Sequence, residues 1–180
     1  GQPQVLPLPS DCAKGGLVSE RRGSVAVQRL PNADKALTVI EDAVGVGAAV
    51  LWVRNAVDDA ISAVDALRRR GIDADLLHAR FALCDRLRHE KSALNTYGKS
   101  REARPRRVLV ATQVVESSLD LDFDVMVSDL APVPALVQRA GRLWRHIDRR
   151  PQSARPVPAP VLHVVSPDPE DVEDAAWLQR

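Results

Sequence analysis

Three arginines recur every third residue in the stretch QRAGRLWRH, which occupies residues 138–146. On a helix this spacing keeps the side chains of Arg139, Arg142 and Arg145 on one broad face. Crowded guanidinium groups repel one another unless an anion is present, and the arginine fork matches phosphate oxygens, so the pattern favours a phosphate site. Gly141 costs a helix about 1 kcal/mol and therefore indicates close backbone approach. The alternative is a solvated basic face of a helix.

The same stretch resembles motif VI of superfamily 2 helicases, which reads Gln or His, Arg, any residue, Gly, Arg, two residues, Arg. The resemblance implies that Arg142 and Arg145 are catalytic arginine fingers. They would reach the γ-phosphate of ATP bound mainly to another RecA-like domain and stabilise charge on the transferred group. Gln138, Arg139 and Gly141 would belong to the ATP-binding surface, against the nucleotide or the facing motor domain.

The stretch VATQVVESSLDLDFD, residues 110–124, resembles motif V of the same superfamily. In that motif a threonine and nearby hydroxyl or amide groups hold nucleic-acid phosphates, and a later acidic residue contacts the nucleotide ribose or couples the two sites. The resemblance implies nucleic-acid contacts for Thr112, Gln113 and Ser117, and a nucleotide contact for Asp120.

The residues of this second stretch also allow a plainer interpretation. Asp120, Asp122 and Asp124 can be turn residues, and Thr112 can cap a helix. A calcium loop is excluded, because no glycine follows the third aspartate and Ala131 stands where the bidentate glutamate would be needed. We expect no metal site.

Two further residues are nucleic-acid-binding candidates. Asn55 follows the apolar run VLWV and corresponds to the asparagine of motif IV, although it can equally be the N-cap of the next helix. Arg80, in LLHARF at 76–81, is placed to meet a phosphate, and its alternative is a surface ion pair.

The residues of these stretches, and their order and spacing over about residues 50–150, are similar to those of the helicase-nuclease of type I CRISPR systems. It departs at Ser117-Ser118, where that family commonly has glutamine and then serine. The resemblance implies a second RecA-like domain of a 3′-to-5′ single-stranded DNA translocase. Its partners would be an upstream RecA-like ATPase domain, a nuclease domain and the RNA-guided surveillance complex.

The sequence contains no G-x-x-x-x-G-K-[ST] loop and no DExH-type magnesium motif. We therefore expect ATP and Mg²⁺ to bind mainly to the first RecA-like domain, and the isolated chain to be inactive as an ATPase. Two other functions stay open. One is a different superfamily 2 helicase, acting in repair or on RNA, and the other is a nucleic-acid-binding module without motor activity.

Strands and helices must alternate to position these residues. Short strand patterns lie at 24–30, 47–53, 73–78, 107–111, 124–128 and 161–165, of which 47–53 is a continuous apolar run. Helical spacing covers 34–43, 57–70, 83–97 and 134 to about 146. The alternation predicts an α/β fold with an open, mostly parallel sheet and helices on both faces, which is the RecA-like architecture. The run at 47–53 is expected to be central, and the polar residues that follow the strands should share one edge.

Composition is consistent with one domain, because 45% of the 180 residues are apolar. Lysine and arginine number 25 against 24 acidic residues, so basic surface must be local. Two distant cysteines and the lack of a signal peptide or apolar span favour a cytoplasmic protein without membrane contact. We expect a connector at 1–23 and the RecA-like domain at 24–180. Within it, 149–160 is expected to be an exposed Pro/Arg-rich excursion that returns to an edge strand. The start without methionine suggests a piece of something longer.

Overall fold

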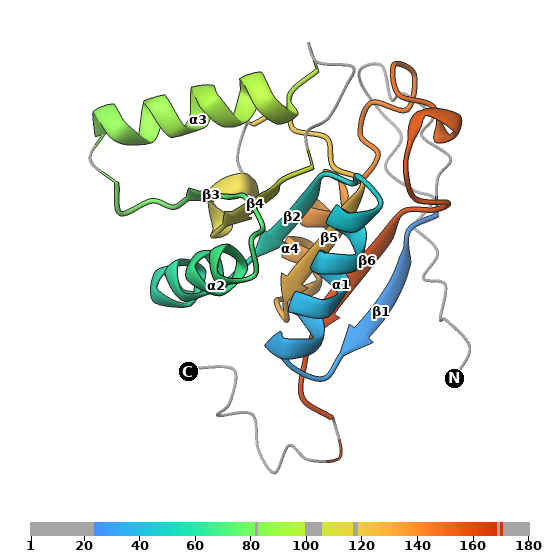
Figure 1. The fold of residues 1–180 in the computed structure, drawn as a ribbon, viewed down its shortest axis with the longest axis horizontal. Coiled ribbons are helices and arrows are strands. Elements are labelled where there is room, and N and C mark those ends of the chain that lie inside the picture. Colours follow the sequence, from blue (N-terminus) through green and yellow to red (C-terminus); the bar gives the residue numbers. More distant parts are fainter. Residues whose placement is uncertain (1–23, 82, 100–105, 117–118, 169, 171–180) are drawn as a thin grey trace.

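The computed structural model describes residues 24–81, 83–99, 106–116, 119–168 and 170. Within them, six parallel strands form one sheet in the order β1-β6-β5-β2-β4-β3 (Figure 1). The strands are β1 (Ala26–Leu30), β2 (Val50–Val53), β3 (Ala74–Leu77), β4 (Val108–Ala111), β5 (Val125–Asp129) and β6 (Val161–Val165). This open parallel sheet confirms the predicted fold class, and β2 is central, as its unbroken apolar run indicated.

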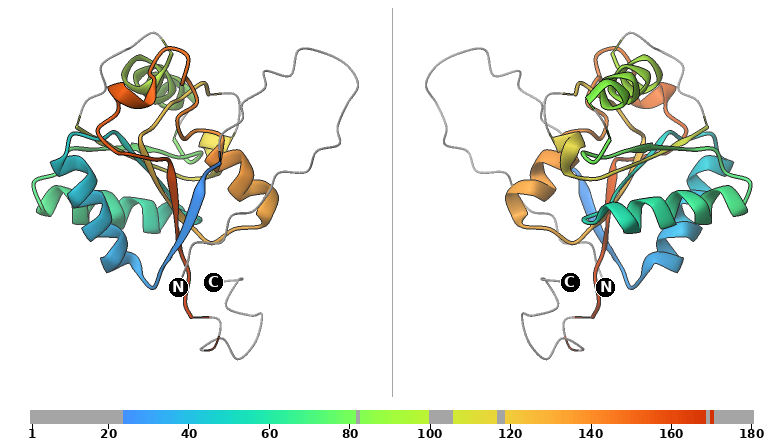
Figure 2. Two further views of the ribbon diagram at one scale, coloured as in Figure 1. Left: turned by 90° about the vertical axis from the view of Figure 1, so that its right-hand side faces the viewer. Right: turned by 90° about the vertical axis from the view of Figure 1, so that its left-hand side faces the viewer.

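Helices cover both faces of the sheet. In the described part of the chain they are α1 (Ala33–Gly45), α2 (Val57–Arg69), α3 (Leu83–Tyr97) and α4 (Val133–Ala140). Figure 2 shows α1 and α2 on one side of the sheet and α4 on the other. α3 belongs with α4, because its Ala93 and Tyr97 pack in the same buried cluster as Leu51. Helical crossovers of this kind are what parallel neighbours require.

The core has two parts because successive side chains of a strand point to opposite faces. Val50 and Trp52 of β2 pack in the cluster beneath α1 and α2. Leu51 and Val53 pack in the cluster on the other face, and all four are essentially fully buried. Since burying one large apolar side chain contributes about 1.5–3 kcal/mol, burial on both faces strongly favours this strand.

A glycine just beyond the last residue explains where α2 and α3 end. α2 stops at Arg69, and Gly71 just beyond has a φ of 73°, the left-handed conformation that glycine adopts without strain. α3 stops at Tyr97, and a Cβ on the next residue, Gly98, would lie 2.2 Å from the carbonyl oxygen of Leu94. Only glycine fits there.

The fourth helix is shorter than expected. α4 ends at Ala140, not near residue 146, and the chain continues through turns. Trp144 has a φ of 49°, a left-handed conformation that a right-handed helix cannot contain. Residues 141–146, called the arginine turn below, therefore lie outside the helix.

The segment after the arginine turn also differs from expectation. Most of 149–160 is exposed, but Arg150 and Arg155 are buried. β6 is not an edge strand, because β1 pairs along its whole length and takes the edge position. The expected connector at 1–23 lies outside the described residues. Among the helices that are described, none is long and apolar enough to cross a bilayer.

Candidate functional site

The carboxyl ends of β2, β3 and β4 bring four of the nucleic-acid-binding candidates to one edge of the sheet. Because the strands are all parallel and adjacent, Asn55, Arg80 and the pair Thr112 and Gln113 follow neighbouring strand ends. Asn55 and Gln113 are exposed, and the amide of Gln113 donates to the carbonyl oxygen of Asn55 at 3.0 Å. Thr112 is buried beneath them. Ser117 lies outside the described residues.

Asn55 is not the cap of the following helix, because the N-cap of α2 is Ala56. The Asn55 side chain instead donates to the carbonyl oxygen of Leu130 at 2.8 Å. Its backbone N–H donates to the carboxylate of Asp129, which also accepts from Nε of Arg54, both at 2.9 Å. These bonds fix the loop after β2 against the end of β5.

Arg80 forms a surface ion pair, which is the alternative to a phosphate contact that its sequence position allows. Its guanidinium lies 3.2 Å from the carboxylate of Asp58, and both side chains are largely exposed. An exposed pair of this kind contributes only about 0–1 kcal/mol, so Arg80 can exchange this partner for another anion at little cost.

Arg139 lies inside the domain, with 1% of its side chain exposed. Nε donates to Glu116 at 2.7 Å, and Nη1 donates to both the hydroxyl of Ser128 and the carbonyl oxygen of Asp129. A longer bond of 3.4 Å reaches the side chain of Asn55. This guanidinium is enclosed between α4, β5 and the 3₁₀ helix Gln113–Glu116, so its bonds here lie within the domain, and its contact with the nucleotide or the facing motor domain stays a prediction.

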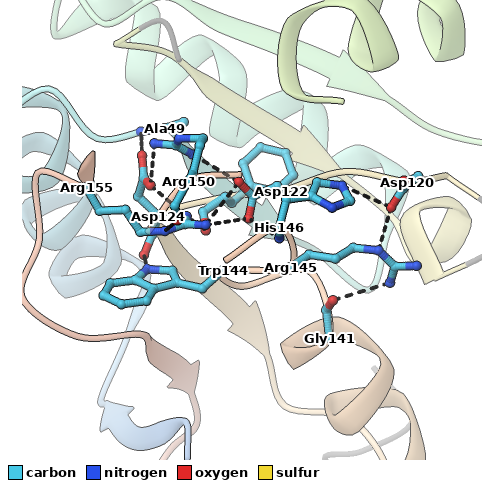
Figure 3. Close-up of polar contacts among 11 residues, drawn as sticks. Ala49, Asp120, Asp122, Asp124, Gly141, Trp144, Arg145, His146, Arg150 and Arg155 are labelled. Atoms are coloured by element: carbon cyan, nitrogen blue, oxygen red, sulfur yellow. Dashed lines mark hydrogen bonds and ion pairs between the residues drawn. The ribbon is translucent and has the colours of Figure 1, made fainter. Parts of the chain in front are cut away.

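Arg142 and Arg145 lie in the arginine turn. Nε of Arg142 donates to the carbonyl oxygen of Val115 at 3.3 Å. Nε of Arg145 donates to Asp120 at 2.5 Å, as Figure 3 shows. Burial lowers the pKa of Arg142, the like charge of Arg145 lowers it further, and Asp120 opposes both effects. Two guanidiniums that disfavour each other in this way suit an anionic ligand.

His146 ends the arginine turn. Burial lowers the pKa of His146, against the opposing effect of the carboxylates of Asp120 and Asp122, so its imidazole is neutral at pH 7. Its Nε2 lies 3.2 Å from Asp120 but without the geometry of a hydrogen bond. Arg145, not His146, is therefore the charged partner of Asp120.

The other two residues assigned to the ATP-binding surface are exposed. Gln138 lies on the last turn of α4, and Gly141 is its C-cap. Gly141 has ordinary helical angles, and the atoms nearest to an added Cβ belong to the preceding turn, at 3.3 Å or more. The close approach expected at Gly141 is therefore absent within the described part of the domain.

A buried ion cluster that the sequence patterns do not predict adjoins the arginine turn. It consists of Asp122, Asp124, Arg150 and Arg155, whose side chains are at most 5% exposed. Asp122 and Asp124 are thus not solvated turn residues. Their spacing of two on an extended segment, which puts both carboxylates on one side, was the available signal. Within the residues described, no group of three acidic, histidine or cysteine side chains could hold a metal ion.

The parallel six-stranded sheet with helices on both faces, and polar loops at its carboxyl edge, define a RecA-like domain. The family model for the C-terminal part of the CRISPR-associated nuclease/helicase Cas3 matches residues 46–148, more than half of the chain. The chain belongs to this Cas3-like C-terminal family.

Individual relatives agree with the family match. The chain is 39% identical over 140 residues to the Cas3 endonuclease/helicase of Escherichia coli, covering 74% of this chain and 16% of the relative. It resembles the crystal structure of T. fusca Cas3-ATP with a TM-score of 0.77 and 32% identity, covering 91% of this chain and 20% of that one. For a chain of a CRISPR RNA-guided surveillance complex, pre-nicking, the TM-score is 0.74, the identity 33%, and the coverage 90% and 21%. The chain thus spans about a fifth or less of these proteins.

Proposed function

We propose that this chain is the second motor domain of an ATP-dependent single-stranded DNA translocase. The translocase moves 3′-to-5′ and feeds target DNA to an associated nuclease in type I CRISPR interference. Membership of a nuclease/helicase family supports the helicase class over a binding module without motor activity. The observation that carries the proposal is the arginine turn, where Arg142 and Arg145 lie together beside Asp120.

The nucleotide side of the proposal rests on charge. Bound ATP with Mg²⁺ supplies the phosphoryl group whose transfer to water drives movement. Arg142 and Arg145 place positive charge toward the facing motor domain, where charge spreads over the transferred group. Arg145 is about one third exposed and is paired with Asp120, so its guanidinium can exchange a carboxylate oxygen for a phosphate oxygen. The similar crystal structure of T. fusca Cas3-ATP supports this assignment.

The DNA side of the proposal rests on the carboxyl edge of the sheet. Asn55, Gln113 and Arg80 are exposed there and carry amide and guanidinium donors, and Thr112 lies directly beneath. Such groups hold phosphates without reading bases, as a translocase requires. The resemblance to motif V adds Ser117 to these proposed DNA contacts. The similar chain in an RNA-guided surveillance complex supports recruitment by such a complex.

Alanine variants of Arg142 and Arg145 test the proposal in the protein that joins this chain to its first motor domain. We expect DNA-stimulated phosphate release to fall by about 10³ to 10⁵, the contribution of an arginine finger. Lysine should rescue poorly, because a point charge cannot reproduce the planar fork. Arg149→Ala, an exposed neighbour outside the arginine turn, is the control and should keep full turnover. Near-normal turnover with loss of DNA affinity in Arg142→Ala and Arg145→Ala would instead make this a DNA-facing surface.

A further inference from the structure

The ion cluster is built so that each arginine bridges both aspartates. Arg150 donates to Asp122 at 3.0 Å and to Asp124 at 2.9 Å, and Arg155 donates to each of them at 3.1 Å (Figure 3). The second oxygen of Asp124 accepts from the backbone N–H of Ala49 at 3.0 Å. Two positive and two negative charges thus compensate each other inside the domain.

The cluster also holds the backbone of the arginine turn. Asp122 accepts from the N–H of His146 at 3.4 Å, and Nε1 of Trp144 donates to the carbonyl oxygen of Asp124 at 3.2 Å. The guanidinium of Arg155 lies over the Trp144 ring, 4.9 Å from its centroid. The Trp144 side chain is therefore held by the segment that contains Asp122 and Asp124 and by Arg155 in the segment after the turn.

Trp144 needs this support, because a bulky residue with a φ of 49° is in a strained backbone conformation. Its N–H donates to the carbonyl oxygen of Phe123 at 3.1 Å, while Phe123 donates its own N–H to Arg142. The left-handed residue lies between Arg142 and Arg145 in the chain and so sets their relative direction. Strain of this kind persists only where surrounding contacts enforce it.

We propose that Asp122, Asp124, Arg150 and Arg155 are positioning residues that hold Arg145 in the orientation needed at the ATP site, and this rests on the proposed function. Both arginines of the cluster lie beyond residues 46–148, which the family model matches. In this proposal the segment after the arginine turn supports the ATP site from behind, through Arg145 and without a nucleotide contact of its own.

The chemistry of the cluster favours positioning over stability. Buried ion networks are often no more stabilising than apolar side chains of the same size, and fixing one arrangement is their better-attested use. Bridging two carboxylates needs the planar fork of arginine, and lysine offers only one point charge. Arg155→Lys and Arg150→Lys therefore keep the net charge while removing the bridge.

The first measurement is independent of ATP. In this 180-residue chain, the NMR signal of the Arg145 Nε–H, assigned by its absence in Arg145→Lys, reports its bond to Asp120. In Arg155→Lys and Arg150→Lys we expect its protection from hydrogen exchange to fall by at least about threefold. The control is Arg107→Lys, which removes an ion pair of 2.8 Å with Asp75 elsewhere in the sheet and should leave the signal unchanged.

The second measurement separates positioning from folding in the protein with both motor domains. We expect Arg155→Lys to lower kcat for DNA-stimulated ATP hydrolysis about tenfold, with KM for ATP unchanged within about twofold. In an Arg145→Lys background the same change should have almost no further effect, because residues that act through one group are not additive. Arg150→Lys serves equally if Arg155→Lys does not fold.

The outcomes distinguish the two proposals. The positioning role is overturned if the Arg145 signal is unchanged in both Arg155→Lys and Arg150→Lys. It is also overturned if Arg155→Lys lowers kcat as much in the Arg145→Lys background as it does in the parent protein. A weakened Arg145 signal together with an Arg145→Ala protein of normal ATP turnover leaves the positioning intact and overturns the proposed function.

Discussion

Nε of Arg139 donates to the carboxylate of Glu116 at 2.7 Å and joins the helix before the arginine turn to the loop after β4. The same guanidinium reaches Asn55, at the end of β2. Arg139 therefore lies beneath the exposed groups proposed to hold DNA and one turn before the groups proposed to reach ATP. A rigid link at this point is suited to coupling the two sites.

Removing the Arg139 side chain should destabilise the domain strongly. Arg139→Ala leaves Glu116, 18% exposed, without its partner, and the loss of one member of a buried pair costs about 3–5 kcal/mol. Urea denaturation measures this free energy of unfolding. The matched control is Arg88→Ala, which removes an exposed pair with Asp85 and should cost at most about 1 kcal/mol. Equal losses in the two variants would show that Arg139 is not part of the framework.

Asp120→Ala should change ATP binding more than catalysis in the protein with both motor domains. Asp120 is assigned a nucleotide contact, and a hydrogen bond to a charged group contributes about 1.5–3 kcal/mol, so KM for ATP should rise about tenfold or more. Because such a contact is made equally in ground and transition states, its loss leaves kcat unchanged, so kcat should fall only through the lost support of Arg145 and by less than KM rises. Steady-state phosphate release at varied ATP measures both constants.

The opposite pattern for Asp120→Ala has a definite meaning. Asp120 also holds Arg145, so a kcat loss as large as that of Arg145→Ala, with KM unchanged, would make Asp120 only the support of that arginine. The nucleotide contact would then be wrong.

Stability should fall as the pH drops below neutral. Burial lowers the pKa of His163 in the folded chain, so between this value and the ordinary 6.5 the unfolded chain binds more protons. The histidine therefore costs no stability above pH 6.5, and the free energy of unfolding falls as the pH decreases through that value. The slope is at most about 1.4 kcal/mol per pH unit for one histidine.

His163→Gln should flatten that slope. Urea denaturation at pH 7.5 and 5.5 measures the difference for both proteins. His78 and His146 also have pKa values lowered mainly by burial, so the variant retains a smaller pH dependence. A variant with the full dependence of the parent chain would show that His163 does not contribute.

Periodicity was enough to predict the framework. β6 and α3 have the predicted bounds, since an apolar run and a glycine-terminated amphipathic pattern are local signals. The length of α4 was wrong because Arg142 and Arg145 also suit helical spacing, and nothing local indicates that Trp144 is left-handed. Contacts with Phe123 and Arg155, distant in sequence, decide that conformation.

In the candidate site, too, local signals predict some features, and contacts between residues distant in sequence decide the others. Residue types and motif order made Arg142 and Arg145 candidates, which they remain, but they did not predict the enclosure of Arg139 or the ion cluster. Burial of a charge depends on which carboxylates the fold brings near it, and the partners of Arg155 are 31 and 33 residues away. A single sequence does not specify such pairings, which is why it predicts an exposed segment at 149–160 whereas Arg150 and Arg155 are buried.

Single-stranded DNA should bind this chain weakly and with strong dependence on salt, because only the phosphate contacts at the carboxyl edge are present.

Arg80 is the sharpest test of that edge. Its exposed side chain lies 3.2 Å from the exposed carboxylate of Asp58 in α2, so DNA phosphate can replace that carboxylate. Arg80→Ala should then reduce the slope of log affinity against log salt by about 0.7, the release of one counterion from a single strand. The control is Arg70→Ala, which removes an exposed pair with Glu41 at the opposite end of α2 and should leave the slope unchanged. Fluorescence anisotropy with a labelled oligonucleotide at several salt concentrations measures both slopes. An unchanged slope in Arg80→Ala would assign the residue to its surface ion pair and remove it from the DNA track.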